Sequence, residues 1–342
     1  MNAVLKAQTK PAQLLLLGVG GVGRAFLERM ATLRPASLQL IGAANSRRAW
    51  QAKITENGGL GSDADTEVEA LLARLHPGDV LVDASASDAV AAQHASWLAR
   101  GIHVVTANKL GAGGPLSRWQ AIAAAQRSGG ACYGDAATVG AGLPLLRSLR
   151  SLQCGGDRIE ALAGVLSGTL AWLFDGFDGR TAFSTRVQRA VAQGYAEPDP
   201  RCDLGGVDVL RKLLILSRAC GVPLQEQDVR LVPVLAVDSV LDADVWGGID
   251  TALAERAGDA MSHGEVLRFV ARWDAAGARI GLESLALDDP LAGGRGCENR
   301  LSIRSSRYRD PPLLIAGPGA GTAVTAAALL DDALTASSAG AA

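Results

Sequence analysis

An acid and a lysine share one face of a segment that is otherwise hydrophobic. In AEPDPRCDLGGVDVLRKLLIL (196–216), Asp208 precedes Lys212 by four residues, just where leucines begin to dominate. Side chains four residues apart are neighbours on a helix. An ordinary solvated pair would contribute only about 0.3–0.5 kcal/mol. However, the surrounding valines and leucines leave little polar face, and a buried ion pair adds little stability. We therefore expect this pair to serve chemistry, with a plain salt bridge as the alternative.

Lysine is rare in this chain, and its few positions are informative. Of 33 basic residues only five are lysine: Lys6, Lys10, Lys53, Lys109 and Lys212. Lysine differs from arginine because desolvation can bring its pKa into a working range. The first two lie near the N-terminus and the third in a polar stretch. Lys109 and Lys212 lie in apolar, glycine-rich surroundings, so we expect these two to exchange protons.

A glycine-rich loop forms the second candidate site. The segment AQLLLLGVG has the composition of a buried strand, and GVGRAFLERMATL has helical hydrophobic spacing. Their junction reads Gly-x-Gly-x-x-Gly, in which the first glycine permits a tight turn and the second lets the backbone approach a pyrophosphate. The third glycine lets the helix pack closely, and the helix N-terminus attracts phosphate charge. The pattern predicts a dinucleotide site at Gly18, Val19, Gly20, Gly21, Val22 and Gly23.

The end of the next strand bears on the choice of cofactor. The strand LQLIGAA is followed by Asn45, Ser46, Arg47 and Arg48, without the acid that usually holds the ribose 2′-hydroxyl of NAD. We therefore expect Asn45, Arg47 and Arg48 to contribute to the cofactor site and to favour the 2′-phosphate of NADP over NAD. Two solvated arginines at the start of a loop are the alternative.

Strands alternate with helices through the first third of the chain. The strands DVLVDASAS (79–87) and IHVVTANK (102–109) flank a helical segment, and this spacing favours a doubly wound parallel sheet of the Rossmann type. Ligands gather at the carboxyl ends of such strands. We therefore expect Ser85, Thr106 and Lys109 to contact the cofactor as well.

The pattern changes after about residue 135. Short alternating apolar runs at 222–310, with helices before them, indicate an α+β unit with a second sheet. We expect three segments: a nucleotide-binding domain at 1–140, a catalytic and dimerisation domain at 141–312, and a C-terminal segment at 313–342 that returns to the nucleotide domain.

Composition excludes several classes of function. The net charge is −2 and no basic block occurs, so neither nucleic acid nor an anionic membrane is an expected partner. No apolar run reaches the roughly 18–20 residues that span a bilayer. The five cysteines are scattered, with no Cys-x-x-Cys pair. This usage is typical of reduced thiols and argues against a zinc site, so we expect a cytoplasmic protein.

Six motifs, in order, resemble those of homoserine dehydrogenases: GVGGVG, VTANK, TVGAGLP, LSGTL, GYAEPDPRCDLGGVDVLRKLLIL and GPGAGTAVTAA. The resemblance extends from about Gln13 to Leu330. It implies NAD(P)-linked interconversion of L-homoserine and L-aspartate 4-semialdehyde, on the route to threonine and methionine. It also implies a homodimer, for which VLRFVARWD offers an apolar strand. We expect a monofunctional chain, with no preceding aspartokinase and no C-terminal regulatory domain.

The resemblance also assigns roles to residues. It implies catalytic roles for Lys212, Asp208 and Lys109, a cofactor contact at Gly321, and a sodium site on backbone carbonyls of Val139, Ala141 and Leu143. Many relatives have an acid where this chain has Ala136, which puts the sodium site in doubt. The substrate-binding residues implied are Glu197, Asp203, Gly168, Thr169 and Tyr195. As alternatives to substrate binding, Gly168 could be a helix-cap glycine and Tyr195 a core aromatic.

Two other readings of the motifs stay open. Another amino-acid dehydrogenase would share the glycine loop but would lack the pair formed by Asp208 and Lys212. A non-enzymatic NADPH-binding regulator would keep the glycine loop and would tolerate the loss of Lys212.

Overall fold

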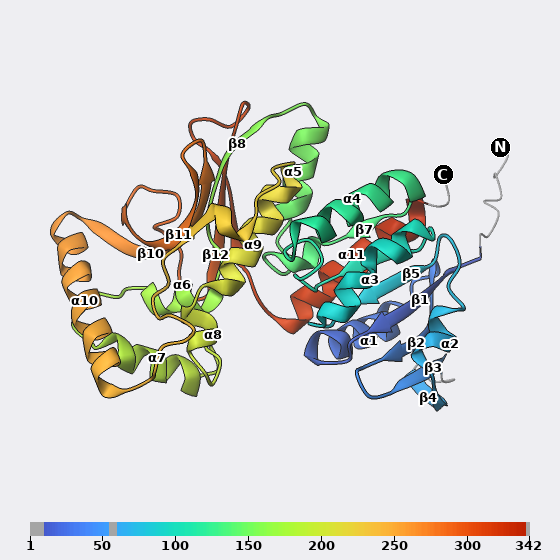
Figure 1. The fold of residues 1–342 in the computed structure, drawn as a ribbon. Coiled ribbons are helices and arrows are strands. Elements are labelled where there is room, and N and C mark those ends of the chain that lie inside the picture. The colour runs from blue at the N-terminus through green and yellow to red at the C-terminus, as the bar shows by residue number, and fades with distance from the viewer. Residues whose placement is uncertain (1–9, 55–59, 340–342) are drawn as a thin grey trace. The chain divides into compact units, whose positions relative to one another are not determined.

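The computed structural model describes residues 10–54 and 60–339 of the 342-residue chain (Figure 1). Lys6 lies outside the described residues. The chain divides into two compact units: Met1–Thr138 with Gly321–Ala342, and Val139–Ala320. The second boundary falls after β13 (Leu313–Pro318), not before it at 312 as expected, because β13 is hydrogen-bonded to β12 (Glu298–Ser305) in the second unit.

The first unit contains a seven-stranded sheet in the order β4-β3-β2-β1-β5-β6-β7. The five strands from β2 to β7 in this order are parallel, which confirms the expected doubly wound sheet. β3 and β4 add an antiparallel hairpin at one edge, which was not foreseen. The bounds are β1 (Ala12–Leu17), β2 (Leu38–Ala44), β3 (Ala49–Ile54), β4 (Leu60–Thr66), β5 (Val80–Asp83), β6 (His103–Thr106) and β7 (Tyr133–Gly134).

The helices of the first unit pack on this sheet. The last helix of the chain, α11 (red in Figure 1), contacts α1 and strands β5, β6 and β7. The shared core includes Leu14, Phe26 and Leu329, each fully buried. The helix expected to return to the nucleotide domain is therefore part of it. The bounds are α1 (Gly21–Leu33), α2 (Val68–Leu72), α3 (Asp88–Ala99), α4 (Leu116–Gly129), the 3-10 turn η1 (Ala136–Thr138) and α11 (Thr322–Ala339).

The second unit contains a six-stranded sheet in the order β13-β12-β8-β10-β11-β9. All pairs are antiparallel except β9 and β11, and helices α6, α9 and α10 pack against β10. The other strands are β8 (Ile159–Val165), β9 (Val229–Leu231), β10 (Glu265–Asp274) and β11 (Gly277–Ala286). The helices are α5 (Leu145–Cys154), α6 (Gly168–Phe174), α7 (Phe183–Ala192), α8 (Arg201–Leu204), α9 (Val207–Ala219), the 3-10 turn η2 (Glu226–Asp228) and α10 (Ala243–Ser262).

One expectation for the second unit needs correction. The region 222–310 was read as strands, yet it also holds the 20-residue helix α10. The strand proposed for dimer contact, β10, is an interior strand bonded to β8 on one side and β11 on the other. Leu267, Phe269 and Val270 are buried within their own unit, so this strand has no free edge.

Among the residues that the structure describes, no helix is long and apolar enough to cross a membrane.

Candidate functional site

The glycine loop has the geometry that its pattern predicts. Gly18 follows β1 with φ 94°, and a Cβ there would lie 2.6 Å from the carbonyl carbon of Ala84. A Cβ on Gly23 would lie 2.0 Å from the oxygen of Gly18. These two glycines are therefore required by the protein itself. A Cβ on Gly20, at the start of α1, would meet nothing within 4 Å, so this side of the loop is open to a ligand.

The arginines after β2 lie in a turn that Asn45 holds together. The Asn45 carboxamide oxygen accepts hydrogen bonds from the backbone N–H groups of Arg47 (2.8 Å) and Arg48 (2.9 Å). The turn adjoins the glycine loop, because Gly18 donates its N–H to the carbonyl of Ala44. Both arginines are exposed. The turn can thus present two cations to an anionic group.

Asp83 is the centre of a buried polar network where β5 ends. Its carboxylate accepts hydrogen bonds from the Ser85 hydroxyl (2.6 Å) and the Asn108 amide (2.9 Å), and pairs with His94 Nε2 (3.0 Å). His94 Nδ1 lies 3.0 Å from the hydroxyl of Tyr133. Asp83 and His94 are fully buried. The network therefore links α3 and β7 to the loops that leave β5 and β6.

Sequence reasoning missed this role of Asp83 and His94. Thr106 joins the same loops, since its hydroxyl donates to the carbonyl of Asp83 and accepts from the N–H of Asn108. Ser85 and Thr106 thus lie together at the carboxyl edge of the sheet as expected, and Lys109 directly follows Asn108 in the chain. The signal for the network was an acid at the end of a buried strand, followed by serines.

Gly321 also lies near the glycine loop. It has φ 131° and directly precedes α11. A Cβ on Gly21 would lie 3.1 Å from the methyl group of Thr322. The first unit therefore brings together the glycine loop and the turn at Gly321.

In the second unit, Lys212 is a buried cation that contacts a carboxylate and a backbone carbonyl. Only 10% of its side chain is exposed, and its ammonium lies 2.8 Å from Asp208 Oδ2. It also donates to the carbonyl oxygen of Leu166 at 2.7 Å. Leu166 directly follows β8, so the ammonium is held where this strand meets the turn into α6. The Asp208 side chain is 46% exposed, which leaves it open to a ligand.

Asn299 on β12 contacts the same carbonyl. Its amide nitrogen donates to the Leu166 oxygen at 3.1 Å, and the side chain is fully buried. Its Oδ1 has no hydrogen-bond partner among the described residues. An unpaired buried acceptor costs about 1–3 kcal/mol. This residue was not identified from the sequence.

Thr169 and Tyr195 are joined beside this turn. The Thr169 hydroxyl donates to the carbonyl of Tyr195 at 2.7 Å, and the Tyr195 ring stacks on Trp172 at 5.2 Å between centroids. Tyr195 is 44% exposed, so it is not a core aromatic. Gly168 is the first residue of α6, and Ser167, not Gly168, caps the helix by accepting from the N–H of Leu170.

The acidic segment is internally braced. Asp203 Oδ2 accepts a hydrogen bond from the backbone N–H of Glu197 at 2.9 Å. This contact positions Glu197, whose side chain is exposed. Asp203 therefore has a supporting role in addition to the substrate contact expected for it.

The stretch expected to bind sodium forms a tight turn. Gly140 and Ala141 both have positive φ, 74° and 52°. The Leu143 carbonyl already accepts a hydrogen bond from the N–H of Leu145. No cluster of three or more His, Cys, Asp or Glu side chains suited to a metal occurs in the described parts of the chain. A cation here would depend on backbone oxygens.

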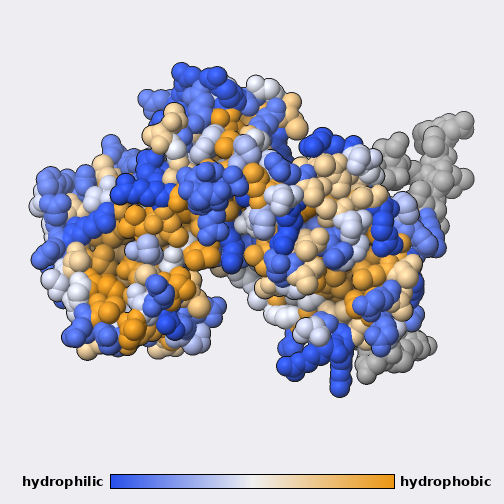
Figure 2. Space-filling view, in the orientation of Figure 1, coloured by the Kyte–Doolittle hydropathy of each residue, from blue (hydrophilic) through white to orange (hydrophobic). Residues whose placement is uncertain are grey.

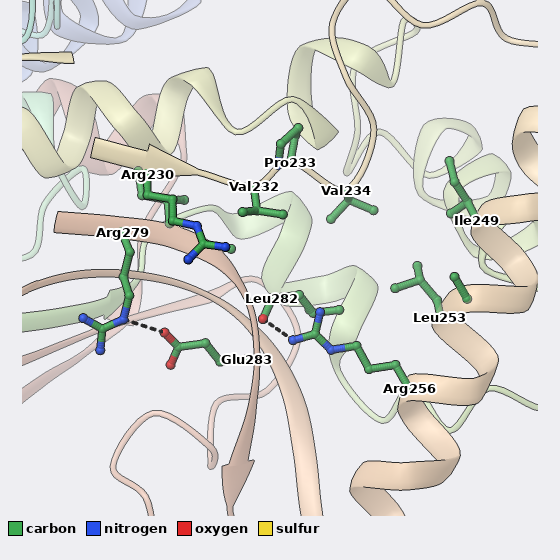
Figure 3. A pocket seen from close by; sticks show the side chains of 13 residues that line it. Arg230, Val232, Pro233, Val234, Ile249, Leu253, Arg256, Arg279, Leu282 and Glu283 are labelled. Carbon is green, nitrogen blue, oxygen red and sulfur yellow. Dashed lines mark hydrogen bonds and ion pairs between the residues drawn. The ribbon is translucent and has the colours of Figure 1, made fainter. Parts of the chain in front are cut away.

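A separate cavity of about 480 Å³ lies in the second unit between β11, the segment after β9 and α10 (Figure 3). Its wall combines apolar side chains with Arg230, Arg256 and Arg279. Arg279 pairs with Glu283, and Arg256 donates to the carbonyl of Leu282. None of the residues expected to bind substrate is among those that line it.

An α/β unit whose first strand leads through a glycine-rich loop into a helix is typical of enzymes that bind NAD(P). Comparison with known families narrows this class. Residues 18–133 match the model for the homoserine dehydrogenase NAD-binding domain, and residues 144–334 match the model for homoserine dehydrogenase. The chain belongs to the homoserine dehydrogenase family.

Individual relatives agree with this assignment. The chain is 35% identical to the homoserine dehydrogenase of Emericella nidulans, over 95% of this chain and 98% of that one. It is 38% identical to bifunctional aspartokinase/homoserine dehydrogenase 2 of Escherichia coli, over 97% of this chain but only 44% of the relative. It thus spans less than half the length of this bifunctional relative. A hyperthermophilic archaeal homoserine dehydrogenase, solved in complex with NADPH, has the same fold (TM-score 0.74, 22% identity, 95% and 97% coverage).

Proposed function

We propose that this protein catalyses the NAD(P)-dependent interconversion of L-homoserine and L-aspartate 4-semialdehyde, in the biosynthesis of threonine and methionine. The observation that carries the proposal is the buried ammonium of Lys212, which lies 2.8 Å from Asp208 and donates to the carbonyl of Leu166 just after β8. The test is to mix purified protein with homoserine and NADP and to follow the nicotinamide absorbance. No homoserine-dependent formation of reduced cofactor would refute the proposal.

The reaction needs a group that exchanges a proton with the substrate oxygen. Oxidation of homoserine removes a hydride from the carbon that bears the hydroxyl and a proton from the hydroxyl itself. A bound nicotinamide supplies the hydride acceptor. Lys212 in its neutral form takes the proton, and in the reverse direction its ammonium donates the proton to the developing alkoxide. Arginine could not do so, because it stays protonated. We assign a second contact with the reacting oxygen to Lys109.

The substrate is an amino acid, so its ammonium group needs carboxylates. We assign this role to Asp208, whose side chain is half-exposed, and to Glu197, which is exposed. Asp203 contributes by holding the backbone of Glu197. Gly168, Thr169 and Tyr195 complete the proposed substrate site at the start of α6, where the hydroxyl of Thr169 fixes the chain at Tyr195.

The first unit fits a dinucleotide, and we propose that NADP is preferred over NAD. Gly20 leaves room for a pyrophosphate, and the turn after β2 presents two guanidinium groups without an acid among them. A guanidinium binds a phosphate through paired charge-assisted hydrogen bonds. The 2′-phosphate would therefore be held by Arg47 or Arg48.

We also propose a monovalent cation, such as sodium, on the backbone oxygens of Val139, Ala141 and Leu143. Support comes from two successive residues with positive φ in this turn. Hard cations prefer oxygen ligands. Titrating sodium against choline at constant ionic strength, with homoserine oxidation as readout, tests this assignment; equal activity in both salts would refute it.

The proposed assembly is a homodimer formed by the second unit. Val232, Val237, Val240 and Leu241 lie within ten residues and are 51%, 55%, 69% and 39% exposed. On the face shown in Figure 2, apolar residues gather over the part of this unit that contains α7 and α10. Clustered exposed hydrophobic residues mark interaction surfaces. We propose that the dimer contact includes the exposed apolar residues of the segment 232–241.

A further inference from the structure

Two side chains from different elements share one carbonyl oxygen in the second unit. Lys212, on α9, donates to the Leu166 oxygen at 2.7 Å, and Asn299, on β12, donates to it at 3.1 Å. A carbonyl oxygen has two lone pairs, so both are engaged. β12 pairs with β8 immediately before Leu166, with Arg300 opposite Val165. Asn299 is therefore anchored to the strand that presents the carbonyl.

The environment of Asn299 fixes its amide in place. The side chain has no exposed surface. The backbone of Gly319 approaches so closely that a Cβ on that glycine would lie 1.9 Å from Asn299 Cγ. The amide therefore cannot swing away from Leu166. A carbonyl held in this way offers the ammonium of Lys212 a fixed acceptor.

Stability alone gives a poor account of an asparagine at this position. Its Oδ1 has no hydrogen-bond partner within the described chain, and burying such an acceptor is unfavourable. A leucine of similar size would avoid that penalty and would leave the bond between Leu166 and Lys212 in place. What leucine would lose is the second donor on the shared oxygen.

We infer that Asn299 is a positioning residue, which acts on the reaction by orienting the Leu166 carbonyl that anchors the Lys212 ammonium. The inference rests on the proposed function, because it requires Lys212 to exchange a proton with the substrate. Small displacements of an acid or base are costly in catalysis, since a shift of about 1 Å can cost about 10²-fold in rate. Asn299 itself is not placed in contact with the substrate.

The test compares Asn299→Leu with the wild type in homoserine oxidation. We expect kcat to fall about 10–100-fold, with the KM for homoserine and the Kd for NADPH changed less than about threefold, and with no decrease in Tm. Ser217→Ala is the matched control. Ser217 is a fully buried residue on α9 whose hydroxyl also has no partner among described residues. This control should keep wild-type kcat.

A double-mutant cycle separates a positioning role from an independent one. Asn299→Leu in a Lys212→Arg background should cause less than about a twofold further loss, because residues that act through one group are not additive. A further loss as large as in the wild type would overturn the inference, as would normal kcat in Asn299→Leu. If Asn299→Leu does not fold, the smaller Asn299→Ala is judged by the same criteria.

The experiment also separates the inference from the proposed function. If the wild type is inactive with homoserine, the proposed function is overturned, and the inference with it. If the wild type is active and Asn299→Leu is unaffected, only the inference is overturned.

Discussion

Lys212 is the residue on which the proposed chemistry depends, and its surroundings explain why a lysine is needed. Its ammonium is almost completely removed from solvent and touches the Asp208 carboxylate and the Leu166 carbonyl. The chain uses arginine for most of its 33 basic residues, so a buried lysine at this position indicates a need for a property that arginine lacks. Lysine can release its proton when desolvated, whereas arginine cannot.

Lys212→Arg should lower turnover by about 10²–10⁴-fold, the range for loss of a general acid or base. NADPH binding should stay near normal, because Lys212 lies outside the nucleotide-binding unit. Asp208→Asn should raise the KM for homoserine if the carboxylate holds the substrate ammonium. Steady-state homoserine oxidation across pH, beside a fluorescence titration of NADPH, measures both effects. Lys212→Arg with more than about half of wild-type turnover and an unchanged pH profile would make the lysine a structural partner of Asp208.

The arginines after β2 allow a second test of individual residues. Replacing Arg47 and Arg48 together by alanine should weaken NADP binding by at least about tenfold, or about 1.4 kcal/mol, and should leave NAD binding nearly unchanged. The reason is that only NADP carries the 2′-phosphate. Arg127→Ala removes an exposed charge at the end of α4 and serves as the control. An equal loss of affinity for both cofactors would exclude this role.

At the scale of elements, the loop from β1 into α1 separates structural glycines from a ligand-binding one. Gly18 and Gly23 have no room for a Cβ because the backbone of Ala84 or Gly18 occupies the space. Gly20 has room within the protein itself. Replacing Gly18 or Gly23 should therefore destabilise the fold, whereas replacing Gly20 should weaken cofactor binding.

Gly20→Ala should keep the Tm of the wild type but raise the Kd for NADPH by about tenfold or more, about 1.4 kcal/mol. The added methyl group would occupy the space through which a pyrophosphate approaches the backbone. Gly18→Ala should instead lower Tm, because its φ of 94° and the contact with Ala84 both strain an alanine. Thermal unfolding and NADPH titration of both variants distinguish the two cases. A Gly20→Ala variant that binds NADPH normally would show that the pyrophosphate does not approach the backbone at Gly20.

The start of β6 contains a histidine that should make stability depend on pH. His103 is 4% exposed, and its Nδ1 accepts a hydrogen bond from the backbone N–H of Cys132 at 2.8 Å. Burial lowers the pKa of His103, with Asp79 opposing the shift. The folded protein therefore favours neutral imidazole, while the unfolded chain takes up a proton near pH 6.5.

Because the folded pKa is the lower one, this contribution is fully present above about pH 6.5 and is lost as pH falls from there through the folded pKa. Urea unfolding at pH 7.5 and 5.5 measures it. His103→Asn keeps an acceptor for Cys132 but does not titrate, so its free energy of unfolding should fall less between the two values. Equal losses in both proteins would show that His103 contributes nothing to the pH dependence.

At the scale of the whole molecule, the residues proposed to bind the cofactor 2′-phosphate and pyrophosphate and the lysine proposed to exchange the proton belong to different units. The glycine loop and the arginine turn belong to the first unit, and the buried lysine with its anchors belongs to the second. The chain leaves the first unit at Thr138 and returns to it at Gly321. The fold thus depends on contacts between residues that lie far apart in the sequence.

The proposed dimer can be tested by light scattering at micromolar concentration. The wild type should have twice the mass of the 35.1 kDa chain. Val240→Asp should shift it toward the monomer, because Val240 is 69% exposed and a charge there opposes burial against another surface. Leu33→Asp, at a 54% exposed position on α1 in the first unit, is the control. A stable, active wild-type monomer would refute the dimer.

Local sequence determined the elements and most of the chemical groups. The parallel sheet, the glycine loop and helix α9 followed from hydrophobic period and glycine spacing, because both depend on residues close together in the chain. Asp208 and Lys212 could be paired for the same reason, since four residues make one turn of helix. The antiparallel hairpin β3–β4 and helix α10 were not predicted from the sequence.

Tertiary structure alone decided which distant groups meet. The bond from Lys212 to Leu166 spans 46 positions, and that from Asn299 to Leu166 spans 133. The contact between His94 and Asp83 depends on how α3 packs beside β5. No periodicity encodes such contacts, because they arise from strand pairing and helix packing between remote segments. The chain itself specified a lysine able to move a proton, and only the fold determined the carbonyl that holds it.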